Sequence, residues 1–178
     1  RLKHAAFDQG PEGQFGLRGA RGHHLHRALV QLQRRVDPLA GAPLPVGAVL
    51  RAMRDMRTRQ ALHDLTGATH AAGWADASGA VALVREDVGR HNALDKPVGA
   101  VGREALSAAQ GVVLVTSRAS FEMVQKTAAA GVGILAAVSA PTALAVRLAD
   151  SAGIALLGFL RDDDATLYSH PERITSQT

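Results

Sequence analysis

The sequence predicts an α/β protein in which a mixed β-sheet lies between two layers of helices. Short apolar runs, typical of buried strands, alternate with helical segments through the second half of the chain. Such alternation requires a largely parallel sheet that is covered on both faces, which makes three layers. A pair of strands around a tight turn adds an antiparallel part. The strands are expected at residues 69–76, 80–85, 111–116, 134–139 and 154–160, and the later helices at 120–130 and 142–152.

Residues 1–37 form a lead rich in Gly, Arg and His, and residues 38–178 form the folded domain. The lead has no strand or helical period up to Gly22, so we expect it to be disordered there. Residues 23–36 could form a helix with one apolar face. His23 and His26 share a face and suggest a metal pair, but they have no carboxylate partner, so a solvated basic face is favoured.

A helix is expected over residues 46–65, with Ala61 and Leu65 on its buried face and Gly67 as its stop. Asp87 can cap the helix that follows the hairpin, and Pro97 should kink or restart that helix because proline lacks the backbone donor. Residues 166–169 are expected to form a short edge strand.

The composition alone limits the classes of protein and the kinds of site that are possible for this chain. The 178 residues suffice for one well-packed domain, and only 3% are aromatic, so the core must consist of Ala, Val and Leu. No apolar run reaches the roughly 18 residues of a membrane span, and no secretory signal is present, so a cytoplasmic protein without membrane contact is expected. The absence of Cys excludes disulfides, thiolate metal sites and thiol nucleophiles within these residues.

The positive charge lies in the first third of the chain. Residues 1–60 hold 11 Lys/Arg against 4 Asp/Glu (+7), whereas residues 61–178 hold 9 against 12 (−3), which gives the net +4. A basic groove for nucleic acid needs aromatic side chains for stacking, and the basic part offers only Phe7 and Phe15. Nucleic acid is therefore not the expected partner.

Polar side chains gather where the predicted strands end. The carboxyl ends of parallel strands meet at one edge of a sheet, so we expect these groups to converge on one crevice. Arginines and helix N-termini favour an anionic ligand, which indicates a phosphorylated or nucleotide-like molecule. The binding residues proposed from this region are Arg90, His91, Asn92, Ser117 and Arg118.

Three alternatives stay open for the polar residues. Glu86, Asp87, Arg90 and Lys96 could instead form a structural ion-pair network. His70 and His91 suit acid-base chemistry near neutral pH, although a lone histidine is more often a hydrogen-bonded structural residue. The three aspartates at 162–164 could chelate Mg²⁺ or form a solvated turn.

Several motifs in fixed order give the sequence a specific resemblance. They are E-D-V-G-R-H-N-A-L-D-K, T-S-R-A-S-F-E-M-V-Q-K, A-V-S-A-P-T-A-L-A-V, L-L-G-F-L-R and Y-S-H-P-E-R-I. In this order they resemble the formate dehydrogenase accessory sulfurtransferase family, FdhD, from about Pro38 to Ile174. The resemblance implies a cytidine-deaminase-like α/β/α fold and a homodimer.

The resemblance also implies a function. Members of the family take sulfur as a persulfide from a cysteine desulfurase and pass it to the molybdenum bis(molybdopterin guanine dinucleotide) cofactor before formate dehydrogenase receives that cofactor. The family's cofactor-binding stretch falls here on Phe159, Leu160, Arg161, Asp162, Asp163 and Asp164. The cofactor is thus implied as a bound client, with no catalytic residue and no metal ligand assigned in this chain.

The chain departs from the family at its sulfur-carrying cysteines. These belong to a C-x-x-C-like motif ahead of the region that matches residues 37–41, and no Cys is present here. A hydroxyl or an imidazole cannot hold a persulfide, so these residues as written should not relay sulfur. Two hypotheses follow: an incomplete sulfur carrier, whose lead is truncated or frame-shifted, or a cysteine-free module that binds the cofactor without sulfur transfer. A deaminase is excluded because Ala71 and Ala72 follow His70 and thiolate ligands are absent.

Overall fold

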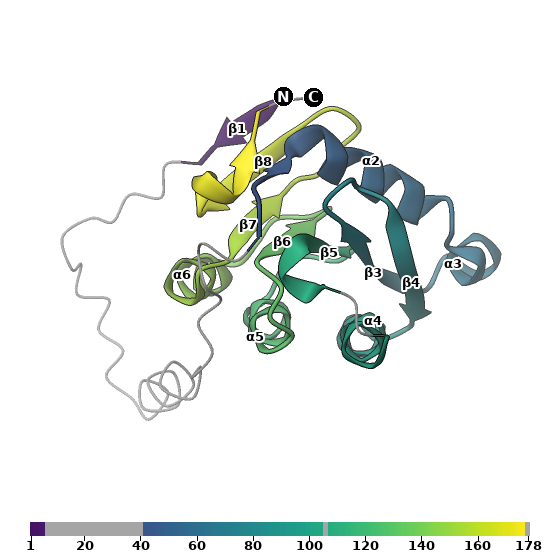
Figure 1. The fold of residues 1–178 in the computed structure, drawn as a ribbon. Helices are drawn as coiled ribbons and strands as arrows, with labels where there is room; N and C mark the ends of the chain where they lie inside the picture. The colour runs from purple at the N-terminus through teal and green to yellow at the C-terminus, as the bar shows by residue number, and fades with distance from the viewer. Residues whose placement is uncertain (6–40, 105–106, 177–178) are drawn as a thin grey trace, which may run out of the picture.

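The computed structural model describes residues 1–5, 41–104 and 107–176, and these form three layers around a seven-stranded sheet (Figure 1). The strand order is β1-β8-β7-β6-β5-β3-β4. The strands are β1 (Leu2–His4), β3 (His70–Asp76), β4 (Val81–Asp87), β5 (Gly111–Val115), β6 (Ile134–Ala137), β7 (Ala155–Gly158) and β8 (Ala165–Ser169). The predicted α/β class and its three layers are confirmed.

The centre of the sheet is parallel and its flanks are mixed. Strands β5, β6 and β7 run parallel, β3 pairs antiparallel with both β5 and β4, and β8 pairs antiparallel with β7. Since β4 and β5 both oppose β3, β4 runs in the same direction as the parallel strands. The carboxyl ends of β4, β5, β6 and β7 therefore lie at one edge of the sheet.

Two apolar cores lie on opposite faces of the sheet. Helices α4 (Arg90–Arg103), α5 (Phe121–Ala129) and α6 (Ala143–Ala152) cover one face, and α2 (Val46–Arg57) covers the other (Figure 1). Leu135 points into the core under the three helices, while Ala136, the next residue of β6, points into the core under α2. This alternation is the period-two pattern of a strand that is buried on both faces.

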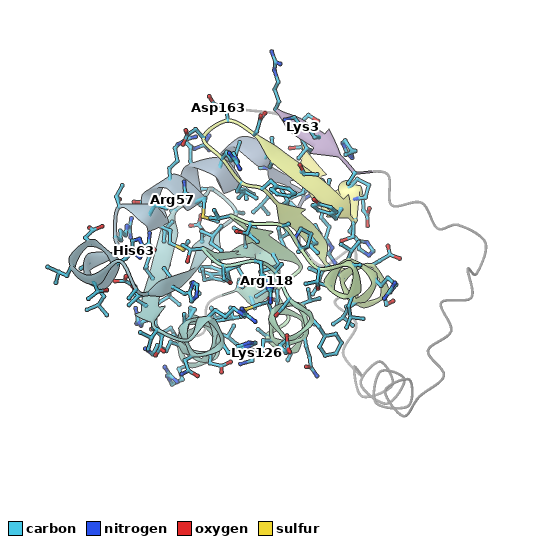
Figure 2. The ribbon with its side chains drawn as sticks, turned by 180° about the vertical axis from the view of Figure 1, so that it is seen from behind. Lys3, Arg57, His63, Arg118, Lys126 and Asp163 are labelled. Carbon is cyan, nitrogen blue, oxygen red and sulfur yellow. The ribbon has the colours of Figure 1, made fainter. Side chains whose placement is uncertain are left out.

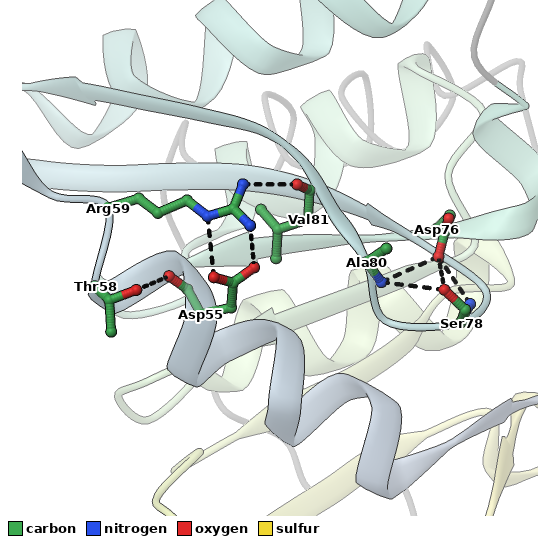
Figure 3. A network of polar contacts seen from close by, with 7 residues as sticks. All are labelled: Asp55, Thr58, Arg59, Asp76, Ser78, Ala80 and Val81. Atoms are coloured by element: carbon green, nitrogen blue, oxygen red, sulfur yellow. Dashed lines mark hydrogen bonds and ion pairs between the residues drawn. The ribbon is translucent and has the colours of Figure 1, made fainter.

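The expected helix over residues 46–65 is divided, and the prediction of one continuous helix was wrong. α2 ends at Arg57, and a separate short helix, α3 (Ala61–Thr66), has no buried residue. Figure 3 shows the reason: the Thr58 hydroxyl donates to the Asp55 carbonyl, and Arg59 turns back to the Asp55 carboxylate and to the Val81 carbonyl of β4 at 2.9 Å. Leu65 is 83% exposed, so the apolar period that runs past Arg57 does not face a core.

The predicted helix stop and hairpin turn are present in the structure, whereas the predictions for the start and the interior of α4 are not all confirmed. Gly67 ends α3 in the left-handed conformation, and the Asp76 carboxylate accepts from Ser78 and Ala80 in the hairpin turn (Figure 3). The expected cap by Asp87 was wrong: the N-cap of α4 is Gly89, without a side-chain cap hydrogen bond, and the Asp87 carboxylate accepts from the Gly89 amide ahead of the helix. α4 continues through Pro97, so the expected restart does not occur.

The N-terminal residues join the sheet, which corrects the expectation of a lead without a strand. β1 pairs parallel with β8, so β8 is not an edge strand. Residues 6–37, with the proposed helix and the His23–His26 pair, lie outside the described residues. A small sheet joins β2 (Leu44–Pro45) to β9 (Ile174–Thr175). Two short 3-10 helices complete the fold: η1 (Ala108–Gln110) precedes β5, and η2 (Pro171–Arg173) precedes β9.

Within the described ranges, no helix combines the length and the apolar character that crossing a bilayer requires.

Candidate functional site

The loops that follow β5, β6 and β7 are hydrogen-bonded to one another into a continuous rim. The Val138 amide donates to the Val115 carbonyl at 3.1 Å, and the Leu160 amide donates to the Ala137 carbonyl at 3.2 Å. The Thr142 amide donates to the Ala119 carbonyl at 3.0 Å. The rim is thus a preformed surface at the carboxyl ends of the strands, the position where open α/β sheets bind ligands.

A pocket of about 440 Å³ lies in this rim, at the ends of β6 and β7. Its volume falls within the range of small-molecule sites, roughly 300–1,000 Å³. Of the eleven residues proposed to bind the cofactor, four line the pocket, and all four belong to the stretch at residues 159–164. The loop after β6 and the end of α2 supply the rest of the lining. The lining residues are Arg57, Val138, Ser139, Ala140, Phe159, Leu160, Arg161 and Asp162.

Phe159 adopts an uncommon backbone conformation at the pocket. Its φ is 53°, in the left-handed region, and its side chain is 41% exposed although it is a large apolar residue. A non-glycine residue in that region costs on the order of 1 kcal/mol or more, and such strain concentrates at ligand sites. The Phe159 ring is therefore an exposed apolar wall on which a flat ligand group can pack.

Two arginines supply the positive charge of the pocket. Arg57 comes from the last turn of α2, and Arg161 comes from the loop after β7. Neither pairs with a carboxylate in the part of the chain that the structure describes. Unpaired guanidinium groups at a pocket suit an anionic ligand because they bind phosphate oxygens in a bidentate manner.

Arg57 is absent from the residues that the sequence proposed. The signal was present: Arg51, Arg54 and Arg57 repeat at every third position, which places three cations on one side of the helix. Which of these three arginines reaches the pocket depends on where α2 ends. The break after Arg57 places this residue, and not Arg51, at the pocket.

The three aspartates form a turn, and two of them face away from the pocket lining. The Arg161 amide donates to the Asp164 carbonyl at 2.9 Å, and the Asp164 amide donates to the Arg161 carbonyl at 3.3 Å. Asp164 binds Lys3 of β1 at 3.1 Å, and the Asp163 carboxylate lies 3.8 Å from Arg54. Of the alternatives left open, the structure favours the turn, since no group of three metal-binding side chains occurs among the described residues.

A second polar group lies further along the same edge, where α4 and α5 begin. Arg90 and His91 open α4, and Ser117 and Arg118 follow β5. Arg118 is labelled in Figure 2. The Ser120 hydroxyl donates to the Glu122 carboxylate at 2.7 Å and lowers the pKa of Glu122, and the nearby His91 and Arg90 lower it further. These residues, together with the exposed Asn92, are not among those that line the pocket.

Glu86, Asp87 and Lys96 have structural roles. Lys96 donates to the Glu86 carbonyl at 2.8 Å and to the Asp87 carboxylate at 2.7 Å. The hydrogen bond from Lys96 and the one from the Gly89 amide lower the pKa of Asp87. The ion-pair alternative thus holds for Asp87 and Lys96. Glu86 takes part through its backbone carbonyl only, and Arg90 has a buried Nε without a hydrogen-bond partner among the described residues.

Glu86 also holds the first turn of α3. Its carboxylate accepts from the amides of Leu62 and His63 at 2.9 and 2.8 Å and from the Thr69 hydroxyl at 3.0 Å. Burial by itself raises the pKa of Glu86, but these hydrogen bonds outweigh it, so the pKa is lowered. A carboxylate near a helix N-terminus is stabilising, and here it comes from a strand instead of from the preceding residue.

Replacement of Glu86 should therefore destabilise the domain in a pH-dependent manner. We expect E86A to lower the free energy of unfolding by about 1–2 kcal/mol at pH 7, the scale of a lost helix cap. Because the folded pKa lies below the unfolded one, the contribution is complete above about pH 4.3 and disappears as the pH falls through the folded value. Urea unfolding at pH 7 and at pH 3 measures both, and equal losses at the two pH values would contradict the assignment.

The matched control is D64A, on the exposed side of the same short helix. It should change the free energy of unfolding by less than about 0.5 kcal/mol.

Comparison with known proteins finds similar sequences that share one family model. The family model described as FdhD/NarQ matches residues 16–175. Proteins named sulfur carrier protein FdhD are 67% identical over 147 residues in Bordetella petrii, 64% over 149 residues in Bordetella bronchiseptica and 57% over 142 residues in Xanthomonas campestris pv. campestris. These alignments cover 82%, 83% and 79% of this chain.

A solved structure agrees with the sequence comparison. A crystal structure from Desulfotalea psychrophila, described as a candidate formate dehydrogenase accessory protein, matches with a TM-score of 0.74 and 30% identity over 82% of this chain and 62% of that chain. The chain spans about half the length of the curated relatives, 53%, 54% and 50% of the three proteins above.

Proposed function

This chain belongs to the FdhD/NarQ family, and from that premise we propose that its domain is the cofactor-binding part of a sulfur carrier for formate dehydrogenase. In this proposal the client is the molybdenum bis(molybdopterin guanine dinucleotide) cofactor, a cysteine desulfurase supplies the sulfur, and formate dehydrogenase receives the product. The observation that carries the proposal is the pocket at the ends of β6 and β7. There Arg57 and Arg161, which pair with no carboxylate among the described residues, lie beside the exposed Phe159.

The residues of the pocket fit one nucleotide end of that client. A guanine dinucleotide carries a diphosphate next to a flat base. Arg57 and Arg161 supply guanidinium donors for the diphosphate, and Phe159 supplies an apolar surface for the base. The volume of about 440 Å³ suits a ligand of nucleotide size and not the whole client, so the rest of the client would extend along the rim.

The residues of this domain bind and orient the client, and they do not supply the sulfur-transfer step. Transfer of a persulfide sulfur needs a cysteine thiolate, and these 178 residues contain none. In this proposal the thiol is supplied from outside these 178 residues. The alignment with the Bordetella petrii sulfur carrier covers 53% of that protein. We propose a homodimer in which two such domains act on one client.

Calorimetric titration of the 178-residue chain with GDP tests the proposal. We expect saturable binding with a Kd in the micromolar range, which corresponds to about −8 kcal/mol, and weaker binding of guanosine, which lacks the phosphates. Absence of heat at millimolar GDP would contradict the proposed function. Equal affinity for guanosine and GDP would contradict the role given to the two arginines.

A second function is favoured by one observation, the complete absence of Cys. The chain would then be a module that holds the cofactor without modifying it. Complementation of a strain that lacks its own accessory protein tests what the two functions share, namely that this chain alone transfers no sulfur. Restored formate dehydrogenase activity would contradict both functions. Failure of this chain to restore formate dehydrogenase activity, together with retained GDP binding, is the expected result for a binding part without its thiol.

A further inference from the structure

We propose that Arg54 of α2 is a positioning residue, which clamps the turn at residues 161–164 so that Arg161 is held at the pocket. The inference rests on the proposed function of that pocket, and it assigns a role to a residue that does not line it. It also explains why three consecutive acids are compatible with a site for a phosphate-bearing ligand.

The contacts of Arg54 lead directly to the turn. Its Nη1 donates to the carbonyl of Asp162, and the same nitrogen lies 3.8 Å from Oδ1 of Asp163. Asp162 is the residue after Arg161, and the turn between Arg161 and Asp164 is closed by two backbone hydrogen bonds. A guanidinium that binds the carbonyl in the middle of a four-residue turn restricts the backbone on both sides of it.

The other side of the turn is held by β1. Lys3 Nζ donates to Oδ2 of Asp164 at 3.1 Å, and the Ala165 amide donates to the Arg1 carbonyl at 3.1 Å. Figure 2 shows Asp163 and Lys3 at the margin of the domain, with Arg57 on the side of α2. The turn is therefore clamped from α2 and from β1, two segments that are far from it in sequence.

This arrangement accounts for the charge of the turn. Asp163 pairs with Arg54 and Asp164 pairs with Lys3, so both negative charges have a cation as their nearest partner. Asp162 is the only acid among the lining residues, and it contributes its carbonyl to Arg54. The pocket lining then carries two guanidinium groups, Arg57 and Arg161, without a carboxylate partner among the described residues, against the single carboxylate of Asp162.

The same helix offers a matched control. Arg51 lies three residues before Arg54, is exposed, and pairs with no carboxylate in the described ranges. R51M and R54M thus remove the same charge from the same side of α2. Only R54M removes contacts with the turn.

Two measurements on the 178-residue chain test the role. In calorimetric titration, R54M should raise the Kd for GDP about 3–10-fold, the scale of one lost hydrogen bond, while R51M stays within about twofold of the wild type. The double variant R54M/R161M should bind like R161M alone, because Arg54 acts through Arg161. Independent, multiplicative effects of the two substitutions, or equal affinities of R54M and R51M, would overturn the inference.

Hydrogen exchange decides the question even without a ligand. The amides of Arg161 and Asp164 should exchange faster in R54M than in R51M, with the exchange of the β6 amides unchanged. If the wild type does not bind GDP, the proposed function fails while this measurement still tests the clamp. Unchanged exchange at the turn in R54M would show that Arg54 does not position it.

Discussion

Replacement of Arg161 by alanine should weaken GDP binding by about 10–100-fold, since a hydrogen bond to a charged group contributes about 1.5–3 kcal/mol. Arg161 follows the strand that ends at the pocket, and no described carboxylate pairs with it, so its guanidinium is available to a phosphate. R57A, which removes the guanidinium that α2 contributes to the same pocket, should have an effect of similar size. Titration calorimetry at one fixed salt concentration measures both.

Two variants make this result specific. R161K keeps the positive charge but loses the planar fork, so its affinity should lie between those of the wild type and R161A. R90A removes an arginine that is not among the lining residues, and it should change the affinity for GDP less than either pocket variant does. If R90A weakens binding as much as R161A, the ligand occupies the second polar group along the edge and not the pocket.

Replacement of Gly111 by alanine should lower the free energy of unfolding by about 3 kcal/mol, the upper end of the usual cost of overpacking. A Cβ at this position would lie 2.4 Å from Cε2 and Cζ2 of Trp74. Trp74 is 4% exposed in the core under α4 and α5, so its ring has no free space into which it can rotate. Gly111 thus allows β5 to begin directly against the indole of its neighbouring strand.

Gly102 provides a control in which the same substitution should have the opposite effect on stability. It lies in α4, is exposed, and a Cβ there would have no neighbour within 4 Å. G102A should therefore stabilise the domain by about 0.5–1 kcal/mol, because alanine restricts the unfolded chain and favours the helix. Chemical unfolding of the two variants under the same conditions measures the contrast. A loss of stability in G102A similar to that in G111A would show that Trp74 is not the cause.

Local signals predicted most of the domain correctly. The apolar runs that became β5, β6 and β7 are buried on both faces, and this pattern is visible in the sequence because both faces need apolar residues. The α2–α3 break was not predictable in this way. It depends on Arg59 reaching Val81 and on Glu86 binding the first turn of α3, and both partners lie more than 20 residues away in the chain.

The sequence by itself determined the fold class and the family, because the apolar period of each element and the motifs of the family are local properties of the chain. It also predicted the edge of the sheet at which the polar residues after the strands gather. Only the tertiary structure decided which polar residues meet there. It placed Arg57 in the pocket, assigned Glu86 and Asp87 to the support of helices, and paired Asp163 and Asp164 with cations of α2 and β1. The physical reason is that charge pairing depends on distance in space, and these partners come from segments that approach each other only when the three layers assemble.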